Sequence, residues 1–242
     1  MFKFLKNIMN NEEVNSTNDA YFLHRVLKTD IKKDPNLEED EIIFGCGCFW
    51  GAEKCFWKLP GVVTTSVGYA GGKKNNPTYY EVCSGLTGHS EVVRVIWDKR
   101  EIDVSDLLKM FWECHDPTQK NRQGNDMGTQ YRSAIYYKNE NNIQTIFASK
   151  EQYQTELIKK NLGLIETEIK MIDSYFYAEQ YHQQYLASAG SRQYCSASPT
   201  KVKLGVFTGS NYKLEDHIWE NFNWEVDKCV LRSDNNPIKN NI

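Results

Sequence analysis

Cys48 is the residue whose sequence surroundings most clearly suggest chemistry. It lies in residues 45–51 (GCGCFWG), between an apolar run that predicts a strand and a segment with helical spacing of apolar residues. Cys48 should therefore lie near a helix N-terminus, where free backbone N–H groups and the helix dipole favour a thiolate. The glycines allow a tight turn, and Phe49 and Trp50 offer an apolar wall. The pattern indicates a reactive cysteine beside an aromatic pocket, with a buried structural cysteine as the alternative.

Glu91 is a second candidate, in residues 90–97 (SEVVRVIW). Strand alternation places it on the same face as Val93 and Val95. A carboxyl group on an apolar face has a raised pKa and stays protonated near neutral pH, which is the state that a general acid needs. The alternative is an ordinary strand-end glutamate in contact with water.

Four further residues lie in or beside polar segments. Tyr79 and Tyr131 could each donate an O–H hydrogen bond to a ligand oxygen, or be ordinary half-buried tyrosines. Asp126, in residues 123–128 (QGNDMG), has the position of a turn residue. Cys195 ends a segment with Gly and Ser residues, which predicts a mobile arm that could bring its thiol to another thiol.

The elements that must position these residues follow an order typical of one mixed sheet layered with helices. Strands are predicted over residues 41–44, 62–69, 90–97, 131–138 and 166–172, and helices over 51–59, 104–115 and 142–160, with a helical turn at 79–84. Residues 116–130 are predicted to form a long loop, a length that is usually functional or disordered. Residues 174–186 are aromatic-rich and predicted to be partly helical. The fold class expected is an α/β or α+β sandwich.

Composition bounds the classes of function. The chain has 242 residues, 40% of them hydrophobic, which is enough for one sizeable core. A net charge of −3 gives no reason to expect nucleic acid or an anionic membrane as partner, and no apolar run approaches the roughly 20 residues of a membrane span. Seven cysteines and no secretion signal indicate a reducing, cytoplasmic setting. A mitochondrial presequence is less well supported, because Glu12 and Glu13 follow the basic start.

Cys46 and Cys48 could in principle bind a metal ion together with His89, His115 or His182. The chain has no second pair of closely spaced cysteines, and the spacing matches no structural zinc pattern. The sequence therefore predicts no metal. A metal-binding redox sensor that uses Cys46 and Cys48 is kept as an alternative.

Several ordered motifs resemble those of the peptide methionine sulfoxide reductases of the A class. They are GCFWG (47–51), GYAGG (68–72), NPTY (76–79), GHSE (88–91), GNDMGTQYRS (124–133) and AEQYHQQYL (178–186). The resemblance implies a two-layer α/β sandwich with a ferredoxin-like core. It also implies reduction of the S epimer of methionine sulfoxide, free or in proteins, with thioredoxin as reductant and no cofactor, by what we expect to be a monomer.

The resemblance implies a role for each polar candidate. Cys48 would attack the sulfoxide sulfur and become a sulfenic acid. Glu91 would protonate the oxygen, Tyr79 and Tyr131 would donate hydrogen bonds to it, and Asp126 would order the polar network. A relative that only binds oxidised proteins is the competing function, but it would be favoured only if Cys48 or Glu91 were replaced.

The same resemblance implies that Phe49 and Trp50 form a cage for the substrate methyl group. Cys195 falls where the resolving cysteine of the family is found, so a Cys48–Cys195 disulfide is expected, which an external dithiol reduces by exchange.

The resemblance also divides the chain. Residues 1–40 are expected to be a partly disordered leader, 41–195 the catalytic domain, and 196–242 an extension packed on or near it. Some family members carry a further cysteine soon after the resolving one, but residues 196–201 contain none. Cys229 is then either a buried structural thiol or a relay thiol that takes the disulfide over from Cys195.

Overall fold

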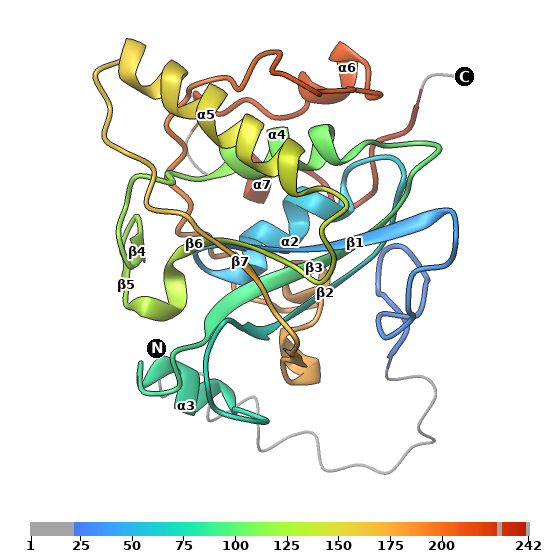
Figure 1. The fold of residues 1–242 in the computed structure, drawn as a ribbon. Helices are drawn as coiled ribbons and strands as arrows, with labels where there is room; N and C mark the ends of the chain where they lie inside the picture. The colour runs from blue at the N-terminus through green and yellow to red at the C-terminus, as the bar shows by residue number, and fades with distance from the viewer. Residues whose placement is uncertain (1–21, 227–228, 241–242) are drawn as a thin grey trace.

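The protein is built around one mixed sheet (Figure 1). A computed structural model describes residues 22–226 and 229–240, and within them six strands pair in the order β7-β6-β1-β3-β2-β8. The strands are β1 (Glu39–Cys46), β2 (Val62–Ala70), β3 (Ser90–Asp98), β6 (Ser133–Tyr137), β7 (Glu168–Met171) and β8 (Tyr175–Tyr177). Neighbouring strands are antiparallel except β6 and β7, which are parallel. The mixed sheet expected from the sequence is confirmed.

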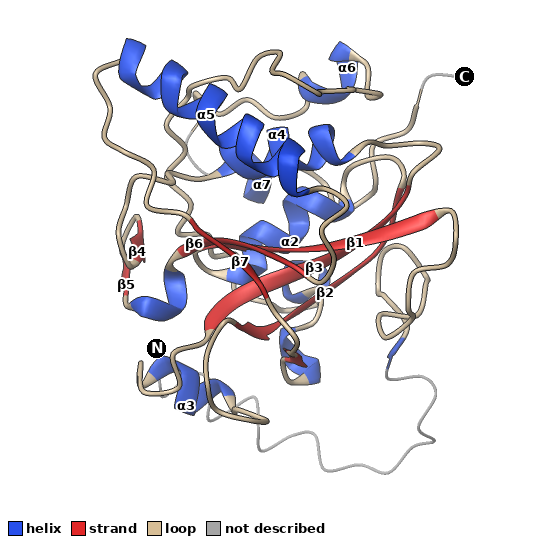
Figure 2. Cartoon of the chain, viewed as in Figure 1, coloured by secondary structure: helices blue, strands red, loops and turns tan. Residues whose placement is uncertain are grey.

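Two helices complete a ferredoxin-like unit. Helix α2 (Phe49–Trp57) connects β1 to β2, and helix α4 (Val104–Cys114) connects β3 to β6. The four central strands therefore have the order 4-1-3-2 of a βαββαβ fold. Figure 2 shows both helices on one side of the sheet, with the long helix α5 (Ile143–Lys159) on the same side. The layered α/β sandwich with this core is confirmed.

Strand alternation and helical periodicity bring the core together between these layers. Phe44 of β1 stacks on Phe56 of α2 and on Phe111 of α4, with ring centroids 4.8 and 5.1 Å apart. The inward positions of β3 and the apolar stripe of α4 pack in the same cluster: Val93, Val95, Trp97, Leu107, Leu108 and Trp112. Each fully buried side chain of this size contributes on the order of 1.5–3 kcal/mol, so this core fixes β1, α2 and β3 relative to one another.

Short elements fill two regions whose prediction was incomplete. The stretch predicted as a long loop contains the hairpin β4 (Arg122–Gln123) and β5 (Asp126–Met127), and then the 3₁₀ helix η2 (Thr129–Tyr131). The aromatic stretch predicted as partly helical forms strand β8 before the 3₁₀ helices η3 (Gln180–His182) and η4 (Tyr185–Ala187). Strand β8 pairs beside Gly68, where a Cβ would lie 2.4 Å from the Phe176 carbonyl oxygen. The residue pattern of 174–186 did not predict that this segment pairs with β2.

The remaining helices are short. Helix α3 (Tyr79–Cys83) follows β2, and helices α6 (Asp216–Trp219) and α7 (Cys229–Arg232) lie in the C-terminal segment, which runs along the helical side of the sheet (Figure 1). Within the described ranges, no helix combines the length and the apolar character needed to cross a membrane.

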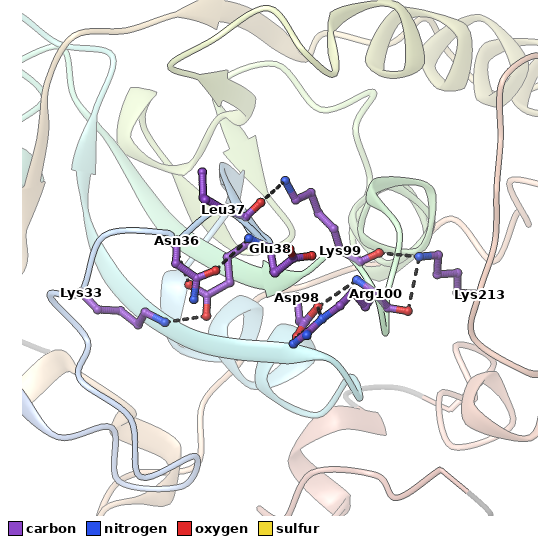
Figure 3. Close-up of polar contacts among 9 residues, drawn as sticks. Lys33, Asn36, Leu37, Glu38, Asp98, Lys99, Arg100 and Lys213 are labelled. Atoms are coloured by element: carbon purple, nitrogen blue, oxygen red, sulfur yellow. Dashed lines mark hydrogen bonds and ion pairs between the residues drawn. The ribbon is translucent and has the colours of Figure 1, made fainter.

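Segments before β1 and after Cys195 are both tied to the turn after β3. In Figure 3, Lys99 donates to the Leu37 carbonyl oxygen (2.9 Å), and Lys213 donates to the carbonyl oxygens of Lys99 and Arg100. Further along the N-terminal segment, buried His24 bonds to the Thr65 hydroxyl group at 2.8 Å. Residues outside the ferredoxin-like unit are thus connected to it by specific polar contacts.

Candidate active site

Cys48 lies at the turn between β1 and α2, as its sequence context predicted. It is the N-cap residue of α2 and only 8% exposed. The turn depends on Gly47, whose φ of +89° belongs to the left-handed region. A Cβ at that position would also lie 2.5 Å from Cβ of Gln123, so the hairpin region can approach Cys48 closely only because residue 47 is glycine.

The Cys48 thiol is protonated in this environment. Burial raises its pKa well above the usual range, and the nearby Glu91 carboxyl group raises it further, whereas the backbone N–H of Trp50 acts in the opposite direction. The sequence predicted that the helix N-terminus favours a thiolate, and the Trp50 N–H does act in that direction, but the thiol is nevertheless protonated. The helix terminus does contribute, but the cost of burying a charge outweighs it.

Glu91 is buried on the same face of β3 as Val93 and Val95, as strand alternation predicted. Its Oε2 accepts a 3.1 Å hydrogen bond from the backbone N–H of Phe49. Burial raises the pKa of Glu91 to about 8; the Phe49 N–H lowers it, and the Asp126 charge raises it. The carboxyl group is thus protonated at neutral pH and lies where α2 begins.

Tyr79 and Tyr131 bring two neutral hydroxyl groups to the same place. Tyr79 begins α3 and Tyr131 ends η2, and both are buried. Burial raises the pKa of each phenol far above its usual value, and for both the second cause is the Glu91 charge. A smaller rise in the pKa of Tyr131 comes from the nearby Cys48 thiol. Elements far apart in the sequence therefore place two O–H donors around the carboxyl group and the thiol.

Asp126 is the second acid of the site, and it is nine-tenths buried on β5. Its Oδ1 accepts a 2.6 Å hydrogen bond from the Tyr194 hydroxyl group. Its Oδ2 has no hydrogen-bond partner among the described residues. Because Tyr194 precedes Cys195, this bond fixes the start of the C-terminal segment against the site. Sequence reasoning did not single out Tyr194, although its position next to Cys195 was a usable signal.

An aromatic cage surrounds Trp50. Its ring stacks on Tyr185 at 3.9 Å and 17°, and its indole N–H donates to Nδ1 of His182 at 3.1 Å. His182 lies 5.1 Å from Phe49 and 4.5 Å from Tyr79, measured between ring centroids. Burial lowers the pKa of His182 to about 3, so the ring is neutral and can accept the indole proton. His182 therefore organises the cage, a role that the sequence did not reveal.

Two carboxyl groups, half-buried Glu179 and fully buried Glu53, support the aromatic residues around Trp50. Glu179 accepts hydrogen bonds from the Tyr79 backbone N–H and the Tyr69 hydroxyl group, both at 2.8 Å. Glu53 of α2 accepts two bonds from Gln184, at 2.8 Å from its backbone N–H and 2.7 Å from its amide. Gln184 directly precedes Tyr185 and has a φ of +46°. These contacts explain why the segment after β8 can hold its aromatic side chains in fixed positions.

Cys195 is buried against the first turn of α2. Its Sγ lies 2.5 Å from the position that a Cβ on Gly51 would occupy. The Cys195 charge also contributes to the raised pKa of Cys48, and both residues are present as thiols. The arm expected to be mobile is thus packed beside the helix that begins after Cys48. The side chain of Cys229, at the start of α7, lies outside the described part of the structure.

Sequence comparisons relate the whole of this site to known proteins. The family model described as "Peptide methionine sulfoxide reductase" matches residues 40–212. The peptide methionine sulfoxide reductase MsrA of Vibrio vulnificus is 53% identical over 180 residues, which cover 74% of this chain and 86% of that protein. The protein of the same name from Azotobacter vinelandii is 57% identical over 164 residues, covering 68% of this chain and 76% of that protein.

Solved structures give the same relation. Methionine sulfoxide reductase A of Corynebacterium diphtheriae superposes with a TM-score of 0.67 and 43% identity, covering 76% of this chain and 89% of that chain. The reduced form of Mxr1 from Saccharomyces cerevisiae superposes with a TM-score of 0.60 and 33% identity, covering 69% of this chain and 93% of that chain. Cys48, Glu91 and Cys195 all lie within residues 40–212, which the family model matches.

Proposed function

Because this chain belongs to the peptide methionine sulfoxide reductase family, we propose that it reduces the S epimer of methionine sulfoxide, free and in proteins, to methionine. The observation that carries the proposal is the meeting of one buried thiol, Cys48, with a carboxyl group, Glu91, whose pKa is raised to about 8. A nucleophile and a proton donor are the two groups that sulfoxide reduction needs. Repair of oxidised proteins in the cytoplasm follows as the role.

In the first step, Sγ of Cys48 attacks the sulfoxide sulfur while Glu91 protonates the oxygen. The S–O bond of the substrate and the new bond between Sγ and the substrate sulfur both break, the oxygen passes to Sγ as sulfenic acid, and methionine leaves. The proton of the thiol returns Glu91 to its neutral form, so the step consumes no net proton. The substrate sulfur is reduced and the cysteine sulfur is oxidised by the same two electrons.

Tyr79 and Tyr131 stabilise the charge that develops on the oxygen. Their raised pKa values keep both hydroxyl groups protonated, so each can only donate to an anionic oxygen. Donors that are already oriented stabilise the transition state more than the ground state, because the oxygen becomes more negative as the S–O bond breaks. Asp126 orders this polar network through Tyr194.

Phe49 and Trp50 bind the methyl group of the substrate. The indole ring is fixed at one face by stacking on Tyr185 and at its N–H edge by the hydrogen bond to His182. A rigid apolar wall of this kind selects a small apolar group and excludes water from the sulfur.

The second thiol of the cycle is Cys195. It condenses with the Cys48 sulfenic acid, releases water and forms a Cys48–Cys195 disulfide. Its packing on Gly51, in the first turn after Cys48, supports this pairing. Thioredoxin, the reductant that the family resemblance implies, then reduces the disulfide by thiol exchange.

The decisive experiment is epimer-resolved turnover of a blocked methionine sulfoxide with dithiothreitol as reductant. The intact protein should consume the S epimer and leave the R epimer, and Cys48→Ser should consume neither. Peptide mapping after one equivalent of substrate should recover Cys48 joined to Cys195. If the intact protein reduces neither epimer, the proposal is wrong.

A further inference from the structure

A second group of sulfur and nitrogen donors lies beside the pair of Cys48 and Cys195. Cys46 is the last residue of β1, Cys114 is the last residue of α4, and His115 follows it directly. All three are buried, and one ligand atom of each lies within 4.8 Å of the others. Sequence reasoning paired Cys46 with Cys48, but it is the packing of α4 on β1 that gives Cys46 its partners.

His115 has the protonation pattern of a metal-binding imidazole. Its Nδ1 lies 2.6 Å from the Phe111 carbonyl oxygen, which can only accept, so Nδ1 carries the proton. Its Nε2 holds the lone pair and lies 2.8 Å from Oγ of Ser133, a contact that a metal on Nε2 would displace. Ser133 has a second partner, Thr167, at 2.7 Å, to which it can turn its proton. A backbone carbonyl on one imidazole nitrogen is the usual outer contact of a histidine that binds metal through the other.

Space for an ion adjoins the two sulfur donors. Cys46 and Cys114 line a cavity of about 20 Å³, which is room for about one water-sized occupant. Cys55 and Cys195 also line it, and the Cys55 thiol interacts with that of Cys114. The remaining wall is largely apolar and includes Trp224 and Val230 of the C-terminal segment. Sulfur atoms are therefore the main polar atoms available to an occupant.

We propose that Cys46, Cys114 and His115 bind one thiophilic d¹⁰ cation of the Zn²⁺ class. Two sulfurs and one imidazole nitrogen are donors that Zn²⁺ favours. The cavity has room for the ion, and Cys55 on its wall offers a further sulfur as fourth ligand. On binding, the two thiols lose their protons to solvent and form two sulfur–metal bonds, with no change of oxidation state. The site joins β1 to α4.

The test is Zn²⁺ titration of the reduced full-length chain against a competing chromophoric chelator. One equivalent should bind, with release of about two protons. Cys46→Ala and Cys114→Ala should each weaken binding at least about 100-fold, because outer contacts of a metal ligand alone are worth about 10- to 100-fold. Cys48→Ser and Cys83→Ala are the matched controls and should bind as the unaltered chain does.

Two results would overturn the site. One is absence of stoichiometric binding to the unaltered reduced chain, and the other is binding that Cys48→Ser removes while Cys46→Ala keeps it. Should Cys114→Ala fail to fold, the spectrum of Co²⁺ in the unaltered chain gives an independent reading. Intense visible bands of tetrahedral, sulfur-bound cobalt support the proposal, and the weak spectrum of octahedral, oxygen-bound cobalt contradicts it.

Discussion

Two groups of buried thiols lie on and around α2, and they differ in what surrounds the sulfur. Cys48 faces a protonated carboxyl group and neutral tyrosines, whereas Cys55 and Cys114 face other thiols and a histidine. Burial contributes to a raised pKa for all three thiols, so burial alone does not distinguish a reactive cysteine. What distinguishes Cys48 is a proton donor for the oxygen of a bound substrate. The predictions below test that difference.

Glu91→Gln should give the largest effect. The amide keeps the shape of the side chain but cannot deliver a proton, so sulfenic acid formation should slow by about 100-fold or more. Single-turnover kinetics at saturating substrate measure this step directly. Cys55→Ala, a change in the other thiol group, is the control and should leave the rate unaltered. An unchanged rate in Glu91→Gln would remove the proposed difference between the two groups.

Trp50→Ala should lower kcat/KM for methionine sulfoxide by about 10-fold or more. Burying a large apolar side chain is worth at least about 1.5 kcal/mol, and much of that apolar contact would be lost from the substrate. Steady-state kinetics with dithiothreitol measure the change. Equal kcat/KM values in the two proteins would contradict the cage around the methyl group.

The pH dependence of stability should report the buried carboxyl group. The pKa of Glu91 is about 8 in the folded chain and near 4.5 when unfolded, so the unfolded state releases its proton first as pH rises. The stabilising contribution is complete below about pH 4.5 and is lost up to about pH 8, by as much as 1.4 kcal/mol per pH unit. Denaturant unfolding across this pH range should show that the free energy of unfolding falls less steeply with pH in Glu91→Gln than in the unaltered protein. The same pH dependence in both proteins would show that Glu91 does not have a raised pKa.

His182→Phe should have a smaller effect, confined to substrate binding. Phenylalanine keeps a ring in the cage but cannot accept the Trp50 indole proton. A single buried hydrogen bond is worth about 0.5–1.5 kcal/mol, so KM should rise by about 2- to 10-fold. The rate of the chemical step at saturation should stay the same, and a fall in that rate alone would show that His182 takes part in the chemistry.

Cys229→Ser should have no effect on thioredoxin-driven turnover. A buried structural thiol is the ordinary state of a cysteine without a catalytic partner. Steady-state turnover with thioredoxin and the rate of the first turnover are the two measurements. A fall in the former with no change in the latter would identify Cys229 as a relay that accepts the disulfide from Cys195.

The features that the sequence predicted are those set by neighbouring residues. The turn at Cys48 and the buried face of Glu91 follow from helical spacing and strand alternation over fewer than about ten residues. The contacts of Tyr194, Glu179 and His182 could not be predicted in this way, because their partners lie on other elements. The direction of the Cys48 pKa was missed for the same reason, since burial depends on the whole fold. The meeting of Cys46 with Cys114 likewise depends on how α4 packs on β1.

The absence of a side chain at residue 51 has a consequence for how long the oxidised enzyme survives. Under the proposed cycle, Cys48 remains a sulfenic acid until Cys195 reaches it, and a second oxidation during that wait gives a sulfinic acid that most cells cannot reverse. A methyl group on residue 51 would lie 2.5 Å from Sγ of Cys195 and push this thiol off the helix. Gly51 therefore shortens the exposure of Cys48 to peroxide, and sets the number of turnovers that one molecule completes before it is irreversibly inactivated.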